Sequence, residues 1–135
     1  MHGITDSTEN YLESIYVLHK HRECVRSIDI VRFLDLSKAS VSVAMRKLRE
    51  SNLIEMDDNG CISLLPDGEV IALRTYKRHV LVRAFLIHIG VDEDIADEDA
   101  CRIEHAISPE SFQALQRYAE QIDLMEQVDD TEFPI

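Results

Sequence analysis

Three side chains that can bind a metal stand close together near the end of this chain. Cys101, Glu104 and His105 are spaced i, i+3 and i+4 within a segment, 91–107, whose pattern predicts a helix. At 3.6 residues per turn, these side chains point to one face of that helix. A thiolate, a carboxylate and an imidazole together suit iron, manganese, cobalt, nickel or zinc. The cluster is only part of a coordination sphere, so other elements must supply the remaining ligands.

The first half of the chain has the helix pattern of a DNA-binding motif. Apolar residues at helical spacing predict helices over 5–21, 27–34 and 38–51, with Ser27 as the N-cap of the second helix. A short turn, 35–37, joins the second helix to the third. The third helix combines one apolar stripe with small polar and basic residues on its other faces. Two short helices joined in this way indicate a helix-turn-helix.

A hairpin is expected directly after this motif. Two short strands, 53–56 and 61–65, flank an Asn59-Gly60 pair, which is typical of hairpin turns. The sequence therefore predicts a mainly α fold that begins with a winged helix-turn-helix domain over 1–70, its wing formed by two strands. A helical bundle with an incidental hairpin is the alternative that this pattern leaves open.

The second half is expected to be entirely helical. A long helix over about 66–89 begins at Pro66, ends before Gly90 and links the winged helix to a second domain, 71–135. Two further helices are predicted over 91–107 and from Pro109 to about Met125. The metal-capable cluster lies on the first of these two helices, so the second domain is the one that holds it.

Charge divides the chain into two parts. The net charge is −12, yet residues 1–90 hold 12 basic and 12 acidic residues, whereas residues 91–135 hold 2 basic and 14 acidic residues. Residues 22–50 carry a local excess of three positive charges. The helix-turn-helix region can therefore face phosphate, while the acidic last third is expected to be repelled by it.

Cysteine usage and hydropathy indicate a cytoplasmic protein. Cys24, Cys61 and Cys101 form no C-x-x-C pair, and their odd number fits reduced thiols rather than a disulfide framework. No apolar run reaches the roughly 18 to 20 residues that a membrane span needs, and residues 1–13 lack the apolar stretch of a signal peptide. We expect no membrane partner.

Four segments of the chain resemble a known family. Residues 7–16 (STENYLESIY), residues 37–48, the pair Arg78-His79 and residues 99–105 (DACRIEH) are similar to the metal-dependent repressors that include the diphtheria toxin repressor and the manganese transport regulator. The resemblance covers nearly the whole chain and implies a winged helix joined to a helical dimerisation domain, with a metal between them that makes the dimer competent for operator DNA. The short length resembles the manganese branch, which lacks an SH3-like third domain.

Carried over by position, the resemblance implies a mixed set of metal ligands. Cys101 is the residue typical of the iron type and Glu13 of the manganese type, whereas the amide of Asn10 matches neither. We therefore expect Mn²⁺ or Fe²⁺, with Zn²⁺, Co²⁺ or Ni²⁺ able to substitute in vitro. The ancillary site of the iron type keeps only His79, because Arg83 and Asp97 stand where Glu and His are expected; a second metal, if bound, would share Glu104 or Glu13. The full predicted set is Asn10, Glu13, His79, Cys101, Glu104 and His105.

The third helix is expected to lie in the major groove of DNA. Residues near its start are placed to meet base edges and phosphates: Ser37, Lys38, Ala39, Ser40, Ser42 and Val43. Three basic residues suit the phosphate backbone: Arg26, Arg46 and Lys47. Few long side chains are positioned for bidentate base contacts, so contacts with thymine methyl groups and DNA shape should carry much of the selectivity. The acidic wing tip, Asp57-Asp58, is not expected to approach phosphate closely.

These observations predict a dimeric, metal-activated repressor of manganese or iron uptake genes that binds double-stranded operator DNA. One alternative is a metal-independent winged-helix regulator, in which Cys101 packs as a small apolar residue. A metalloenzyme built on the same cluster is disfavoured, because the sequence has no H-E-x-x-H or nucleophile motif. We therefore expect no catalysis and no small organic substrate.

Overall fold

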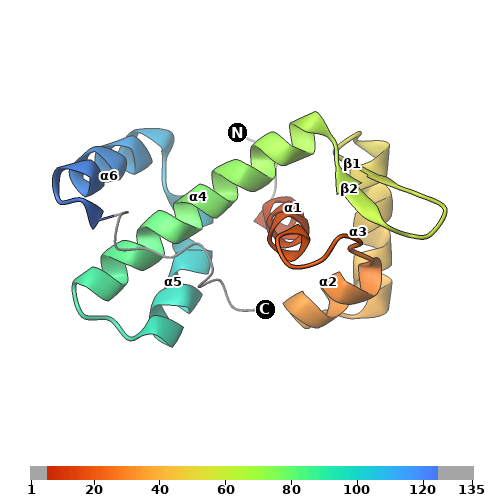
Figure 1. The fold of residues 1–135 in the computed structure, drawn as a ribbon, viewed down its shortest axis with the longest axis horizontal. Helices are drawn as coiled ribbons and strands as arrows, with labels where there is room; N and C mark the ends of the chain where they lie inside the picture. The colour runs from red at the N-terminus through yellow and green to blue at the C-terminus, as the bar shows by residue number, and fades with distance from the viewer. Residues whose placement is uncertain (1–5, 125–135) are drawn as a thin grey trace. The chain divides into compact units, whose positions relative to one another are not determined.

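A computed structural model of the chain describes residues 6–124, and in this range it forms six helices and one two-stranded antiparallel sheet (Figure 1). The chain separates into two compact units, and the boundary between them falls between Arg74 and Thr75, inside the longest helix. The predicted mainly α fold with a two-stranded wing is confirmed. In chain order the elements are α1 Asp6–His19, α2 Ser27–Leu34, α3 Lys38–Glu50, β1 Ile54–Met56, β2 Ile62–Leu64, α4 Pro66–His88, α5 Glu93–Ala106 and α6 Pro109–Gln121.

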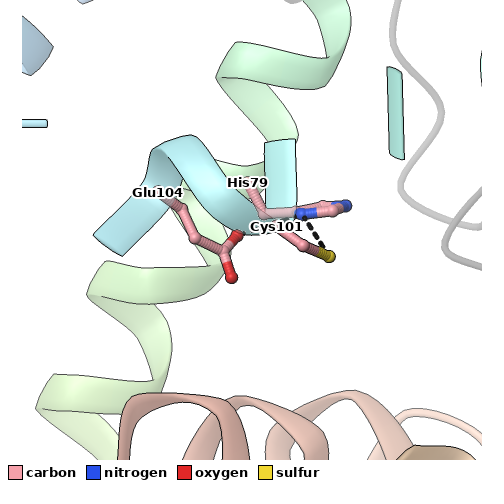
Figure 2. Close-up of side chains that lie close together, drawn as sticks. All are labelled: His79, Cys101 and Glu104. Carbon is pink, nitrogen blue, oxygen red and sulfur yellow. Dashed lines mark hydrogen bonds and ion pairs between the residues drawn. The ribbon is translucent and has the colours of Figure 1, made fainter. Parts of the chain in front are cut away.

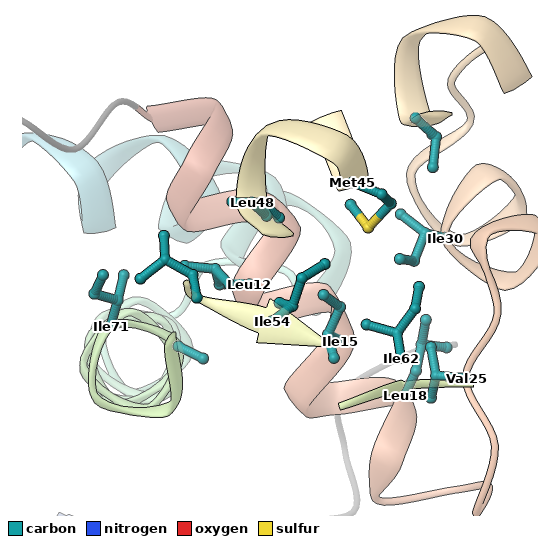
Figure 3. Packing of buried hydrophobic residues seen from close by; sticks show 13 residues of the cluster. Leu12, Ile15, Leu18, Val25, Ile30, Met45, Leu48, Ile54, Ile62 and Ile71 are labelled. Carbon is teal, nitrogen blue, oxygen red and sulfur yellow. The ribbon is translucent and has the colours of Figure 1, made fainter. Parts of the chain in front are cut away.

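The first unit is organised around one apolar core. Side chains from α1, α3 and both strands meet there, as Ile15, Met45, Ile54 and Ile62 illustrate in Figure 3. The predicted apolar stripe of α3 lies in this core and leaves its polar and basic residues outside. The core is completed by other buried residues: Leu12, Leu18, Val25, Ile30, Val41, Leu48, Leu53, Ile71 and Ala72.

The turn between α2 and α3 is tight because its residues satisfy the helix ends. Asp35 takes a left-handed conformation, with φ of 54°, and ends α2. Ser37 then caps the start of α3, since its side chain accepts a hydrogen bond from the backbone N–H of Ser40.

The prediction that Ser27 caps α2 is wrong. Arg26 occupies the cap position, and its backbone N–H donates to the carboxylate of Asp29 at 2.9 Å.

The wing pairs Ile54 with Leu64 and Met56 with Ile62. Its turn depends on Asp57, whose Oδ1 accepts the backbone N–H groups of Asn59 and Cys61 at 2.9 Å each. The acidic wing tip therefore has a structural role in closing the hairpin. Gly60, with φ of 80°, supplies the left-handed position that the turn requires.

A disulfide joins Cys24 to Cys61, so the expectation of three reduced thiols is wrong. These cysteines are 37 residues apart in the sequence. They meet because Val25 forms an antiparallel bridge with Ile62, in which the Ile62 N–H donates to the Val25 carbonyl at 2.7 Å. A cysteine count cannot detect such a pairing, because the bridge arises only when α1, α2 and β2 pack together.

The second unit contains α5, α6 and most of α4. Asp92 caps α5 by accepting the N–H of Asp94, so this helix begins at Glu93 instead of 91. Ser108 caps α6 as predicted, and Pro109 is its first residue. Leu81 and Ala84 of α4, Ala119 of α6 and Leu124, which follows α6, form the small core of this unit. No helix in the range 6–124 has the combined length and apolarity that crossing a membrane requires.

Candidate metal centre

Two helices of the second unit bring the metal-capable side chains together. α4 contributes His79, and α5 contributes Cys101 and Glu104 from one face (Figure 2). Ligand atoms from these three residues all lie within 4.8 Å of one another. The sequence places Cys101 and Glu104 on one helical face, and the packing of α4 against α5 adds the imidazole.

The His79 ring uses its Nδ1 atom toward this cluster. Nδ1 lies 3.0 Å from Oε2 of Glu104 and 3.7 Å from Sγ of Cys101. Bonds from a transition metal to nitrogen, oxygen or sulfur are about 2.0 to 2.3 Å long, so two ligands of one ion lie roughly 3 to 4 Å apart. Both distances from Nδ1 lie in this range, and the whole set within 4.8 Å forms a candidate site for one metal ion.

Burial favours this use of the residues. His79 and Glu104 are 1% and 0% exposed, whereas Cys101 is exposed. A buried carboxylate is costly unless a positive charge or hydrogen bonds compensate for it. His105 adds a second nearby imidazole, with its Nε2 3.4 Å from Oε1 of Glu104. Glu104 therefore lies between two histidines, at the centre of the cluster.

Arg78 anchors the end of the helix that carries this cluster. Its Nη1 donates to the backbone carbonyls of Glu104 and Ile107, at 3.3 and 3.1 Å. The last carbonyls of a helix have no partner within that helix, so a guanidinium there stabilises the helix end. The same group lies over the Phe112 ring, 5.6 Å from its centroid. In the sequence, only the family resemblance drew attention to Arg78, and it gave no role.

The other two predicted ligands are on α1, in the first unit. Glu13 is buried there, with 5% exposure, and Asn10 is partly buried. Both remain predictions as metal ligands. The second unit thus brings together His79, Cys101 and Glu104 with His105 beside them, which is four of the six predicted ligands.

The residues predicted to contact DNA are all exposed. Eight of them lie at the start or along the outer face of α3, from Ser37 to Lys47. Ser37 and Ser40 also hydrogen-bond to each other through their hydroxyl groups at 2.9 Å, which orders the first turn of the helix. Arg26 lies outside α3, and its Nε donates to the carbonyl of Asn59 in the wing turn. Their contacts with DNA stay predictions.

Comparison with protein-family models gives two matches that together cover most of the chain. Residues 3–61 match the model described as "Iron dependent repressor, N-terminal DNA binding domain". Residues 65–129 match the model described as "Iron dependent repressor, metal binding and dimerisation domain". The second match contains the whole cluster on α4 and α5.

Relatives of similar length are named as transcriptional regulators. The HTH-type transcriptional regulator MntR of Lysinibacillus sphaericus is 32% identical over 91% of this chain and 86% of its own length. The protein of the same name from Bacillus pumilus is 31% identical over 93% of this chain and 85% of its own length.

Two solved structures with the same fold belong to chains that are longer than this one. The manganese regulator SloR has a TM-score of 0.76 and 27% identity, covering 87% of this chain and 55% of that structure. IdeR of T. acidophilum has a TM-score of 0.74 and 27% identity, covering 91% and 56%. The chain therefore spans about half the length of these two structures.

Proposed function

This chain belongs to the family of iron-dependent repressors, and on that premise we propose that it is a metal-activated repressor of manganese or iron uptake genes that acts in the cytoplasm. It has a DNA-binding domain and a domain for metal binding and dimerisation. Its partners are therefore DNA and a second copy of the chain. The relatives are transcriptional regulators, a function without catalysis. A double-stranded operator is the DNA that a repressor of this kind recognises.

The observation that carries this proposal is the cluster of His79, Cys101 and Glu104 on two packed helices. It lies in the half of the chain that matches the metal-binding and dimerisation model. A metal-independent regulator does not need a buried carboxylate within 3.0 Å of a buried imidazole with a thiol beside them. The cluster thus supports metal activation over the alternative.

In the proposed mechanism, His79, Cys101, Glu104 and His105 hold a divalent ion on the second domain, and Asn10 and Glu13 on α1 complete the ligand set. A divalent ion held by these residues would offset the negative charge of the carboxylates and the thiolate. Metal binding would stabilise only the conformation in which all coordinating side chains are available at once. It would therefore shift the population toward that conformation. The exposed face of α3 would then meet the major groove in each half of a two-fold operator.

The ligand types leave manganese and iron as the two candidate metals. Carboxylate and amide oxygens suit Mn²⁺, whereas the Cys101 thiolate favours softer ions such as Fe²⁺. SloR is described as a manganese regulator, and the family models are described as iron-dependent. We propose that availability and affinity together decide between these two metals.

DNA binding with and without metal tests the proposal. The purified chain would select sequences from a random duplex library in Mn²⁺, and the selected duplex would then be titrated in EDTA and after addition of Mn²⁺, Fe²⁺, Zn²⁺ or Co²⁺. Fe²⁺ is added without oxygen. We expect tight binding only with metal. Equal affinity in EDTA and in every metal would instead establish the metal-independent alternative.

Variants identify the site within the same assay. Cys101→Ala and Glu104→Ala should each abolish metal-induced DNA binding while the dimer stays folded, as measured by circular dichroism and sedimentation. Glu98→Ala, at an exposed position of the same helix, is the matched control and should bind as the parent chain does. Retained metal dependence in both ligand variants would place the metal elsewhere.

A further inference from the structure

The ring of His79 is contacted at both of its nitrogens. Nδ1 faces Glu104 and Cys101, as described above, and Nε2 lies 3.4 Å from Oδ1 of Asp97. That same carboxylate oxygen accepts the Nε–H of Arg83 at 2.5 Å. The side chains of His79, Arg83 and Asp97 are 2%, 10% and 19% exposed, so all three are largely shielded from water.

The contact between Nε2 of His79 and Asp97 matters for metal binding because it determines which ring nitrogen carries the proton. A neutral imidazole that binds a metal through Nδ1 must keep its remaining proton on Nε2. A carboxylate that accepts this proton fixes the ring orientation and makes the ligating nitrogen a better donor. Asp97 lies on the correct side of the ring for this, and a small movement would shorten its 3.4 Å contact to a hydrogen bond.

Arg83 holds Asp97 in the position from which it can accept the proton of His79 Nε2. Arg83 follows His79 by four residues on α4, so the two side chains emerge on the same face of the helix, one turn apart. The guanidinium holds the Asp97 carboxylate, which comes from α5, against the ring. The positive charge of Arg83 also offsets the negative charge of the Asp97 carboxylate. This makes the carboxylate a poor ligand for a metal and leaves it as a fixed hydrogen-bond acceptor.

We propose that Arg83 and Asp97 are positioning residues of the metal centre: Arg83 fixes Asp97 beside Nε2 of His79, so that Nδ1 is presented to the metal next to Cys101 and Glu104. The proposal deepens the proposed function and rests on it. It also assigns a role to Arg83 and Asp97, which the family resemblance marks only as departures from the ancillary site of the iron type.

Metal affinity of matched variants tests this role. Asp97→Ala and Arg83→Met are compared with Asp99→Ala and Arg102→Met, which break an exposed ion pair of 3.4 Å on the same helix. Calorimetric titration of the full chain with Mn²⁺ should show affinity about 10 to 100-fold weaker for the first two variants, as expected for residues that orient a ligand. The controls should stay within about twofold.

Nitrogen-15 NMR of the chain loaded with Zn²⁺, which is diamagnetic, separates positioning from a general structural effect. The His79 ring should carry its proton on Nε2, and the signal of this proton should be protected from exchange in the parent chain and in Asp97→Asn, which keeps an acceptor oxygen. It should be lost by exchange in Asp97→Ala. A ring that binds Zn²⁺ through Nε2 would overturn the proposal, as would unchanged Mn²⁺ affinity in both Asp97→Ala and Arg83→Met. Absence of Mn²⁺ binding by the parent chain would instead refute the proposed function itself.

Discussion

At the residue scale, Glu104 is the centre of the candidate site. It is fully buried, and its two carboxylate oxygens face the imidazoles of His79 and His105 at 3.0 and 3.4 Å. Cys101 has the opposite character, because its thiol is close to His79 but exposed. The site therefore combines a shielded carboxylate and imidazole with an exposed sulfur.

Asn10 offers a sharp test of the proposed ligand set. Asn10→Asp replaces a neutral amide oxygen by a carboxylate, which binds Mn²⁺ more strongly because it adds a negative charge to a hard oxygen donor. We expect the calorimetric affinity for Mn²⁺ to rise on the order of tenfold. Ser7→Asp, at an exposed position of α1, adds the same charge elsewhere and should leave the affinity unchanged. If the two variants behave alike, Asn10 is not a ligand.

At the scale of elements, the first turn of α4 fits closely against the wing. A Cβ atom at Gly68 would lie 2.0 Å from the backbone carbonyl oxygen of Leu53, just before β1. The N–H of Leu65 donates to that same carbonyl at 3.0 Å. The glycine is therefore required by a close approach of two backbones, and this approach sets how α4 leaves the winged helix.

Gly68→Ala should destabilise the protein for this reason. In an open helix position the change would stabilise by about 1 kcal/mol, because alanine has the higher helix propensity. Here the new methyl group overlaps backbone that cannot move aside easily, and overpacking of this kind costs about 1 to 3 kcal/mol. Urea denaturation should show a lower midpoint than in the parent chain. Glu69→Ala, which is exposed one residue later, should leave the midpoint nearly unchanged, and a stabilised Gly68→Ala variant would contradict the close approach.

At the scale of the whole molecule, the distribution of charge along the chain follows its division into a DNA-binding domain and a metal-binding and dimerisation domain. The DNA-binding part matches the electrically balanced residues and includes the basic outer face of α3. The acidic excess belongs to residues 91–135, which include the metal-capable helix α5. Such a distribution suits a protein that must attract divalent cations to one domain and phosphate to the other.

The salt dependence of DNA binding should reveal which cations contact phosphate. Each phosphate contact releases counterions, so its loss lowers the slope of log affinity against log salt by about 1. We expect Lys47→Ala, on the exposed face of α3, to reduce the slope by about that amount in saturating Mn²⁺. Lys77→Ala, an exposed lysine of the metal-binding and dimerisation domain, should not change it. Equal slopes for Lys47→Ala and the parent chain would remove Lys47 from the interface.

The sequence by itself determined the elements and the spacing within them. Helical periodicity and caps located α1 to α6 to within a few residues, and Asn59-Gly60 located the hairpin, because these signals depend on neighbours within about one turn. Cys101, Glu104 and His105 were recognised for the same reason. The predicted N-cap of α2 was one residue off. The Asp29 carboxylate accepts the backbone N–H of Arg26, so Arg26 and not Ser27 is the N-cap.

Only the tertiary structure decided which distant side chains meet. The pairs His79 with Glu104, Arg83 with Asp97 and Cys24 with Cys61 are separated by 25, 14 and 37 residues, and no local pattern fixes such contacts. They follow from the packing of one element on another, which depends on the shapes of many side chains at once. The sequence therefore supplied the candidate ligands on one helix, and the family resemblance added His79. The packing of α4 against α5 brought its imidazole to them, together with the ion pair behind it.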